Sequence, residues 1–249
     1  DEVREQLAAV KPDAMACFAY GKIFGPRTLA LFPRGAVNLH PSLLPRWRGC
    51  APVPAAILAG DRETGISIQK MVKEMDAGDI LAQRHYTIGN EETAGELLDR
   101  LSREGAPMLV EVLDRLEQGT ATGIPQSHDE ATYCGMLCKH DGEIDWKRAA
   151  SEISAQIRAF HPWPGAFTHA RGTDLLIHRA EPFSAPEETG SAPGTVLGID
   201  KKAGILVQTG NGVLAITELQ WRAKKPLDWK SFLNGTRDFT GTLLGSPHI

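Results

Sequence analysis

Two side chains that could act together on a substrate lie two positions apart in the short segment 36–40. Asn38 offers an amide donor and His40 an imidazole, and the segment is bounded by Gly35 and Pro41. Alternate residues of a β-strand point to the same face, so a strand here projects both side chains together. In an open α/β sheet, ligands bind at the carboxyl ends of the strands. The pair could stabilise a developing oxyanion and move a proton, although the spacing alone is also compatible with a structural Asn and a surface His.

An acidic loop, residues 76–79, supplies carboxylates between two expected strands. Asp76 and Asp79 stand at its ends. An Asp in such a loop commonly forms an Asx turn, and this is the plain alternative for both residues. If the loop returns to the sheet edge that carries His40, one carboxylate would orient the imidazole ring and favour its protonated form.

The loop after His40, residues 41–49, combines two prolines and a Leu-Leu pair with two arginines around Trp47. Arg46 and Arg48 could meet a carboxylate or a phosphate, and the apolar residues could line a pocket for a flat aromatic ring. A rigid surface loop is the alternative interpretation.

Four potential metal ligands crowd into thirteen residues: His128, Cys134, Cys138 and His140. Their spacing does not match the patterns typical of zinc sites. The chain also lacks the Gly-rich loops that bind nucleotide phosphates. We therefore expect a reaction that needs no metal.

The first half of the chain has the hydrophobic pattern of an α/β domain. The almost unbroken apolar run 13–20 predicts a strand buried on both faces of a parallel sheet. Leucines and valines at helical spacing predict a long helix over 93–116. The other expected elements are strands at 36–40, 65–72 and 80–88 and a helix that ends near Gly60. Together they predict a partial Rossmann-like parallel sheet.

The second half has short strands at close spacing, which is typical of a small β-barrel. A helix over 146–160 precedes strands at 175–178, 194–197, 205–208 and 213–220, with a hairpin turn at 210–212 and a last helix over 228–233. We expect a first domain over 1–120, a linker over 121–141 and an OB-like barrel over 142–249.

The composition is that of an ordinary globular protein, with 42% hydrophobic and 23% charged residues in a chain of 249. These fractions exclude collagen-like, low-complexity and disordered classes. The apolar runs are shorter than the roughly 18 residues that a membrane span needs, and the first residues do not form a signal-peptide pattern. Four cysteines are too sparse for a disulfide scaffold. We expect a cytoplasmic protein that does not act at a membrane.

The charge is unevenly distributed along the chain. Residues 196–249 hold seven Lys or Arg and four Asp or Glu, a net charge of +3, whereas the remaining residues carry a net charge of −7. An acidic body with a basic end hints that the end contacts a polyanion.

Several long motifs occur in an order typical of one enzyme family. N-L-H-P-S-L-L-P-R-W-R-G begins at Asn38, and A-G-D-x-E-T-G-I-S-I and M-D-A-G-D-I follow it. Later come I-D-W, I-R-A-F-H-P-W-P-G, G-T-V-L and G-N-G-V-L. From about residue 13 to 241 the chain resembles the formyltransferases that use 10-formyltetrahydrofolate. Its second half is similar to the C-terminal domain of the branch that formylates methionyl-tRNA.

The resemblance implies formyl transfer from 10-formyltetrahydrofolate to the α-amine of initiator methionyl-tRNA. Asn38 and a protonated His40 would donate hydrogen bonds to the oxyanion, and Asp76 would hold His40 and manage the proton that the amine loses. The stretch that contacts tetrahydrofolate matches Ser42, Leu43, Leu44 and Pro45. From the charge pattern we expect tRNA contacts at Arg46, Arg48, Lys201, Lys202, Lys224 and Lys225. We expect a monomer.

The chain departs from the family pattern in two places. Pro41 stands where the tRNA enzymes often have Gly, as in the relatives that formylate glycinamide ribonucleotide. Family members also carry an additional N-terminal segment with the first strands of the sheet, and the given sequence begins after it. Two alternatives therefore stay open: a formyltransferase that acts on a sugar-nucleotide amine, and a non-catalytic RNA-binding fragment.

Overall fold

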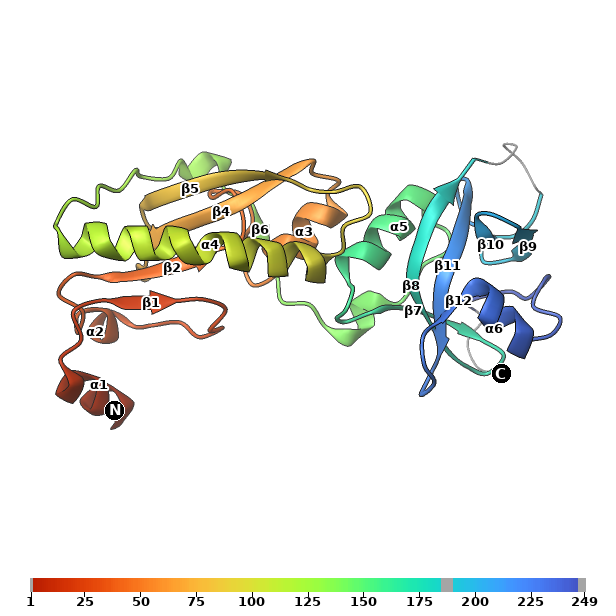
Figure 1. Ribbon diagram of the computed structural model, residues 1–249, viewed down its shortest axis with the longest axis horizontal. Helices are drawn as coiled ribbons and strands as arrows, with labels where there is room; N and C mark the ends of the chain where they lie inside the picture. Colours follow the sequence, from red (N-terminus) through yellow and green to blue (C-terminus); the bar gives the residue numbers. More distant parts are fainter. Residues whose placement is uncertain (1, 185–189, 246–249) are drawn as a thin grey trace. The chain divides into compact units, whose positions relative to one another are not determined.

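The computed structural model describes residues 2–184 and 190–245 (Figure 1). The chain divides into two compact units. Unit 1 comprises Asp1–Asn90 and Glu96–Met136, and unit 2 comprises Glu91–Gly95 and Leu137–Ile249. Most of the stretch expected as a linker, residues 121–136, thus belongs to unit 1.

Unit 1 contains a four-stranded sheet in the order β1-β2-β4-β5. The α/β class is confirmed, but the sheet is mixed: β1 and β2 run parallel, whereas β2–β4 and β4–β5 are antiparallel pairs. The loop between β4 and β5 is too short for the crossover that a parallel pair requires. The strands are β1 (Met15–Cys17), β2 (Ala36–His40), β4 (Glu63–Lys70) and β5 (Ile80–Thr87).

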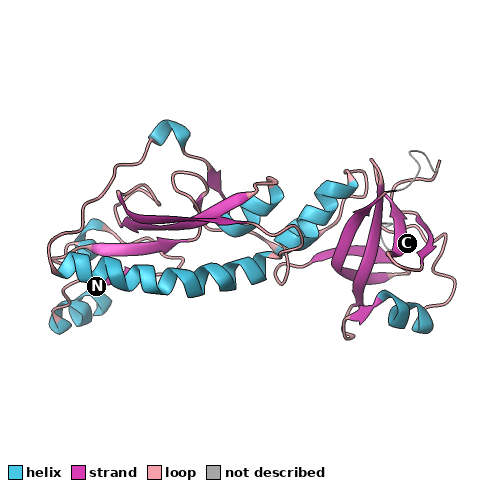
Figure 2. Cartoon of the chain, turned by 45° about the horizontal axis from the view of Figure 1, so that its top comes forward, coloured by secondary structure: helices cyan, strands magenta, loops and turns pink. Residues whose placement is uncertain are grey.

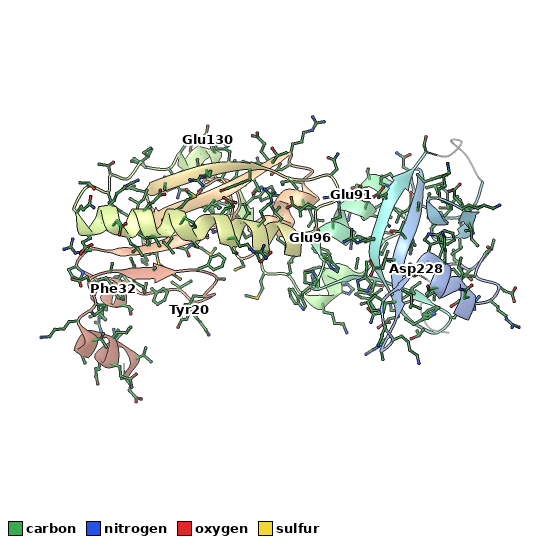
Figure 3. All side chains as sticks on the ribbon, in the orientation of Figure 1. Tyr20, Phe32, Glu91, Glu96, Glu130 and Asp228 are labelled. Atoms are coloured by element: carbon green, nitrogen blue, oxygen red, sulfur yellow. The ribbon has the colours of Figure 1, made fainter. Side chains whose placement is uncertain are left out.

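The expected strand over 13–20 is mostly wrong. Only the three residues of β1 form a strand, and β1 lies at the edge of the described sheet. Phe18 is 41% exposed and Tyr20 59% exposed, the latter labelled in Figure 3. The apolar run therefore did not indicate a strand buried on both faces, since Met15 and Cys17 are half-buried and Ala16 is exposed in this edge strand.

The long helix α4 (Ala94–Glu117) runs alongside this sheet in both views (Figures 1 and 2). Its buried side chains in unit 1 recur at helical spacing: Leu97, Leu101, Met108 and Val112. Gly105 lets the helix approach, because a Cβ there would lie 2.6 Å from Leu39 Cδ1. The other helices of unit 1 are α1 (Glu2–Val10), α2 (Pro26–Leu29), α3 (Pro52–Leu58) and the 3₁₀ turn η1 (His128–Glu130).

A second, two-stranded sheet in unit 1 supports the loop that follows β2. Strand β3 (Arg48–Gly49) pairs in parallel with β6 (Tyr133–Cys134). Thr132 adds two further bonds, since its Oγ1 accepts from Trp47 N at 2.9 Å and its backbone oxygen accepts from Arg48 N at 2.9 Å. A segment more than eighty residues away in sequence therefore holds this loop.

Unit 2 contains an antiparallel sheet in the order β7-β8-β11-β10-β9, with β12 paired to β11. Residues 241–245 bond to both edges of this sheet. Val196 N donates to Thr242 O at 2.9 Å beside β9, and Gly245 N donates to His169 O at 2.8 Å on β7. This tail links the two edge strands, as the expected small barrel requires. The strands are β7 (Ala166–Ala170), β8 (Thr173–Phe183), β9 (Val196–Asp200), β10 (Gly204–Gln208), β11 (Val213–Trp221) and β12 (Leu227–Asp228).

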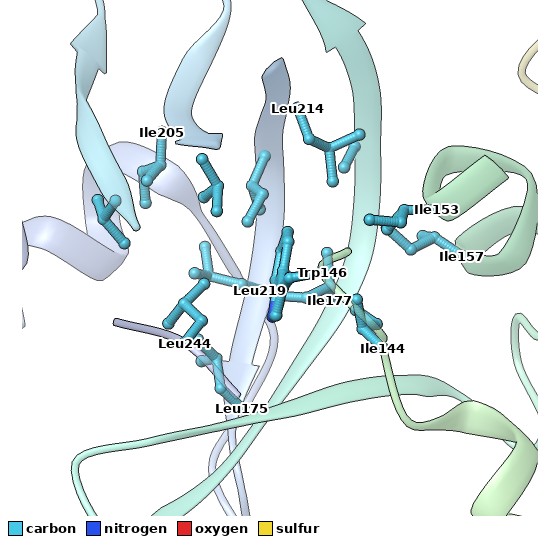
Figure 4. Close-up of a cluster of buried hydrophobic side chains, with 14 of the residues drawn as sticks. Ile144, Trp146, Ile153, Ile157, Leu175, Ile177, Ile205, Leu214, Leu219 and Leu244 are labelled. Carbon is cyan, nitrogen blue, oxygen red and sulfur yellow. The ribbon is translucent and has the colours of Figure 1, made fainter. Parts of the chain in front are cut away.

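An apolar core fills unit 2 between the sheet and helix α5 (Figure 4). Helix α5 (Ala150–Ala159) is shorter than the expected helix over 146–160, and Trp146 lies before it and packs into the core. Strand β7 was not predicted from the sequence. Helix α6 (Trp229–Gly235) begins after Asp228, labelled in Figure 3, whose carboxylate accepts from the amides of Lys230 and Ser231. A 3₁₀ turn, η2 (Lys139–Gly142), completes the unit.

No helix within residues 2–184 and 190–245 combines the length and the apolar character that crossing a bilayer would require.

Candidate active site

The Asp76 carboxylate is the meeting point of the residues singled out in the sequence. Asn38 Nδ2 donates to Asp76 Oδ1 at 3.4 Å, and His40 Nδ1 lies 3.7 Å from Asp76 Oδ2. The loop between β4 and β5 therefore returns to the end of β2, the geometry on which a role for Asp76 depends. His40 is 4% exposed, whereas Asn38 and Asp76 are half-buried.

Two donors that sequence reasoning missed also hold this carboxylate. Gln69 Nε2 donates to Asp76 Oδ1 at 2.8 Å, and the backbone amide of Gly49 donates to Oδ2 at 2.9 Å. Gln69 lies opposite Asn38 across the β2–β4 pair. Gln69 follows the apolar residues Ile66 and Ile68 at alternate positions of β4, and no local pattern in this strand distinguished it as a partner of Asp76. With these bonds the carboxylate is fixed in position before any substrate binds.

Gly49 can take its position only because it lacks a side chain. Its φ is +119°, in the left-handed region, and a Cβ built on it would collide with the carbonyl oxygen of Cys134. A larger residue would separate β3 from β6 and withdraw the amide from Asp76.

The protonation of His40 differs from the expectation. Burial lowers the pKa of His40 below its ordinary value, and the Asp76 charge and the Trp47 carbonyl, which both raise it, do not offset burial. The lowered pKa favours the neutral imidazole over the protonated form that the resemblance implied. Its Nε2 lies 2.8 Å from Trp47 O, so we assign the proton to Nε2 and the lone pair to Nδ1.

The stretch expected to contact folate forms a tight, internally bonded turn. Ser42 and Leu44 are buried, whereas Leu43 and Pro45 are half-buried. Ser67 Oγ donates to Ser42 O at 2.7 Å and accepts from Leu44 N at 3.1 Å. The Ser42 and Leu44 side chains therefore support the turn, and Leu43 and Pro45 are the two with exposed surface for a ligand.

Arg46 and Trp47 are anchored together by Asp61. Arg46 Nη2 lies 2.8 Å from Asp61 Oδ1, and Trp47 Nε1 donates to Asp61 Oδ2 at 2.8 Å. The Arg46 guanidinium also lies 5.1 Å from the centre of the Trp47 ring. Arg46 is exposed, and its guanidinium is paired with the Asp61 carboxylate.

Arg48 requires a correction. Its side chain is 1% exposed and forms hydrogen bonds inside unit 1, chiefly to Gln126 Oε1 at 2.7 and 3.1 Å. A buried guanidinium is not available to a phosphate at the surface, so Arg48 is not a tRNA contact in this structure. The sequence pattern of two arginines around a Trp could not distinguish the exposed arginine from the buried one.

The four lysines expected to contact tRNA lie on exposed turns of unit 2. Lys201 and Lys202 form the turn between β9 and β10, and Lys224 and Lys225 lie between β11 and β12. Their charges face solvent.

The described residues include no group of three or more His, Cys, Asp or Glu arranged to hold a metal ion. Cys134 Sγ instead points at backbone oxygens, those of Arg48 at 3.4 Å and Trp47 at 3.6 Å. Burial raises the pKa of this thiol.

Two family models match the chain. Residues 1–113 match the formyl transferase model, and residues 136–237 match the model of the formyl transferase C-terminal domain.

Curated relatives match nearly the whole chain. The methionyl-tRNA formyltransferase of Treponema denticola is 51% identical over 96% of this chain and 75% of its own length. That of Symbiobacterium thermophilum is 42% identical over 99% of this chain and 75% of its own length.

Solved structures share the fold. A methionyl-tRNA formyltransferase from Clostridium thermocellum superposes with a TM-score of 0.59 at 24% identity, over 72% of this chain and 76% of that one. HypX from Aquifex aeolicus in complex with tetrahydrofolic acid gives 0.70 at 20% identity, over 93% of this chain and 40% of that one. The sugar 3N-formyl transferase WlaRD gives 0.66 at 17% identity, over 88% and 77%.

Proposed function

The chain belongs to the formyl transferase family, and we propose that it transfers the formyl group of 10-formyltetrahydrofolate to the α-amino group of initiator methionyl-tRNA. Relatives at 42–52% identity over most of the chain carry the methionyl-tRNA formyltransferase name. The observation that carries the chemistry is the fixed Asp76 carboxylate, which Asn38 contacts and which faces His40 Nδ1.

Formyl transfer begins when the neutral amine attacks the formyl carbon. The carbonyl oxygen then becomes an oxyanion, and a donor aimed at it lowers the barrier. Asn38 Nδ2 is the donor of the site that can serve, since its bond to Asp76 Oδ1 is long, at 3.4 Å, and easily exchanged. The tetrahedral intermediate collapses as the bond from carbon to folate N10 breaks.

The proton that the amine loses moves through His40. Because His40 is neutral, its Nδ1 lone pair accepts this proton and later delivers it to folate N10. The Asp76 carboxylate, 3.7 Å from Nδ1, stabilises the imidazolium that forms between the two steps. His40 thus acts as a base and then as an acid, and the oxyanion is served by Asn38.

The folate donor takes the side of the site that Leu43 and Pro45 line. These two residues keep exposed surface beside the catalytic loop, and their turn is held rigid by Ser67 and by Gln83, whose Nε2 donates to Leu44 O at 3.0 Å. A pre-formed apolar wall suits a flat aromatic ring system such as a pterin.

The tRNA contacts we propose are the exposed cations. Lys201, Lys202, Lys224 and Lys225 supply positive charge on turns of unit 2, and Arg46 supplies it beside the catalytic loop. Phosphate contacts of this kind position the nucleic acid without taking part in the reaction.

Single-turnover formylation of charged initiator tRNA tests the proposal directly. We expect this chain to convert methionyl-tRNA to formylmethionyl-tRNA with 10-formyltetrahydrofolate and to leave a sugar-nucleotide amine unchanged. The Asn38→Ala variant is the control for the assigned site. If the chain formylates the sugar-nucleotide amine and not methionyl-tRNA, the proposed acceptor is wrong. Binding of tRNA without turnover would leave only RNA binding.

A further inference from the structure

One side chain outside the proposed trio grips the backbone of the Asp76 loop. Gln126 Nε2 donates to Asp76 O at 2.9 Å and to Gly78 O at 2.7 Å, and it lies 3.3 Å from Gln69 Oε1. Gln126 is 7% exposed, so these bonds do not compete with bulk water. It lies in the stretch 121–141, which the sequence analysis assigned to a linker.

The other end of the same amide is fixed by a buried cation. Arg48 Nε and Nη2 both donate to Gln126 Oε1, at 3.1 and 2.7 Å. Arg48 Nη1 also donates to His128 Nδ1 at 3.3 Å and to Tyr133 Oη at 3.4 Å. Because a guanidinium only donates, it obliges the Gln126 oxygen to face it and the Gln126 nitrogen to face the loop carbonyls.

The loop needs such a grip. Asp76 has a φ of +52°, in the left-handed region, which Asp adopts at a smaller cost than most non-glycine residues but not without a cost. The same residue must present its carboxylate to Asn38 and His40. A backbone that relaxed toward an ordinary φ would turn that carboxylate away.

We propose that Arg48 and Gln126 form a positioning pair that holds the Asp76 loop in its reactive conformation. Neither residue touches the reacting atoms; the pair acts through Asp76. This inference rests on the proposed role of Asp76 in formyl transfer. It gives the stretch 121–136 a part in catalysis and gives Arg48 a role other than the tRNA contact expected from the sequence.

Unit 2 offers a matched control for this device. Gln156 on α5 is 3% exposed, and its Nε2 donates to the carbonyls of Asp141 and Glu143, both at 3.0 Å. As with Gln126, the two carbonyls are two residues apart. Replacing either Gln by Glu keeps the size and exchanges a donor for an oxygen that faces two carbonyl oxygens.

The test compares Gln126→Glu with Gln156→Glu in single-turnover formylation at saturating folate and methionyl-tRNA. We expect Gln126→Glu to lower the rate by up to about tenfold, no more than the loss expected of Asp76→Asn through which it acts, with little change in either KM. Arg48→Lys keeps the charge but loses the pair of donors that Gln126 Oε1 accepts from, and it should also lower the single-turnover rate. Gln156→Glu should stay within about twofold of the parent.

A double mutant separates positioning from general damage. If Gln126 acts through Asp76, adding Gln126→Glu to Asp76→Asn should lower the remaining rate by less than about twofold. A further tenfold loss in that background, or an equal loss in Gln156→Glu, would overturn the proposal.

Hydrogen exchange distinguishes this inference from the proposed function. Amides of residues 71–79 should exchange at least about tenfold faster in Gln126→Glu and at the parental rate in Gln156→Glu. If the parent chain formylates nothing, faster exchange still supports the grip on the loop, and unchanged exchange refutes it.

Discussion

The buried residues of the two units differ in polarity. In unit 2 a large set of buried apolar residues shares one core, which includes Ile153, Ile177 and Leu219. Beside the catalytic loop of unit 1 the interior is polar, with Arg48 and Gln126 fully or nearly buried. An apolar core accepts substitutions of similar volume, whereas a buried polar network requires every partner. We therefore expect substitutions to affect stability in unit 2 and the reaction rate in unit 1.

The largest effect on the reaction rate is expected from the removal of the His40 side chain. His40→Ala should lower the single-turnover rate on the order of a hundred- to a thousandfold, because the proton acceptor is lost, while folate binding survives. His178→Ala in unit 2, which removes an imidazole bonded to Gln220 at 2.7 Å, is the control and should leave the rate within about twofold. A loss smaller than about fivefold in His40→Ala would exclude His40 from the reaction.

Asp76→Asn should have a smaller effect with a distinct pH dependence. The Asp76 charge raises the pKa of His40, so removing it lowers that pKa further. Since neutral His40 accepts the proton, the rate rises with pH through this pKa, and the variant should reach its plateau at a lower pH. Its plateau should be about tenfold lower, because the imidazolium loses its counter-charge. The methionyl amine titrates identically in both proteins, so the difference between the two pH–rate profiles is the measurement. Coincident profiles would assign Asp76 a structural role.

A conservative change in the unit 2 core should alter stability alone. Ile177→Val removes one methylene from a residue that is 2% exposed, and we expect a loss of about 0.5–1.5 kcal/mol in the free energy of unfolding. The formylation rate of the folded variant should match the parent. Chemical denaturation and single-turnover kinetics on the same preparation measure both quantities. If Ile177→Val lowered the rate as much as Asp76→Asn, the expectation that unit 2 substitutions affect only stability would be wrong.

The smallest effect on the rate is expected from the exposed lysines. Replacing Lys224 and Lys225 by Ala should weaken tRNA binding and flatten the log–log dependence of affinity on salt by roughly one to two units, because fewer counterions are released. The rate at saturating tRNA should barely change. The measurement is a binding titration at several salt concentrations. An unchanged slope would show that Lys224 and Lys225 do not contact tRNA phosphates, and Arg46 or other residues would then be the candidates.

Sequence patterns were sufficient wherever local periodicity governs structure. The short segment 36–40, bounded by Gly35 and Pro41, predicted β2 with Asn38 and His40 two positions apart, and the helical spacing of leucines predicted α4 almost to its ends. The mixed sheet and strand β7 were missed, because pairing partners depend on distant segments.

Which residues form the site was easier to predict than their protonation, burial and hydrogen-bond partners. The protonation of His40 follows from its burial, which the packing of several segments produces. The burial of Arg48 and the grip of Gln126 have no local pattern at all, because each depends on a partner 78 residues away. An isolated Gln in a loop gives no indication of what it holds.

That separation along the chain has a consequence for the order of folding. The β4–β5 pair closes a short loop, whereas the bonds from Trp47 and Arg48 to residues 126–133 each close a loop of about eighty residues at a larger entropic cost. We expect β4 and β5 to form early and the brace on the Asp76 loop late, so pulse-labelled amides of β4 should be protected before those of residues 74–79. On a ribosome, which releases the chain from its N-terminus, all three proposed catalytic residues emerge well before Gln126 and Thr132. The nascent protein therefore carries its reactive groups for some time before it can hold them in place.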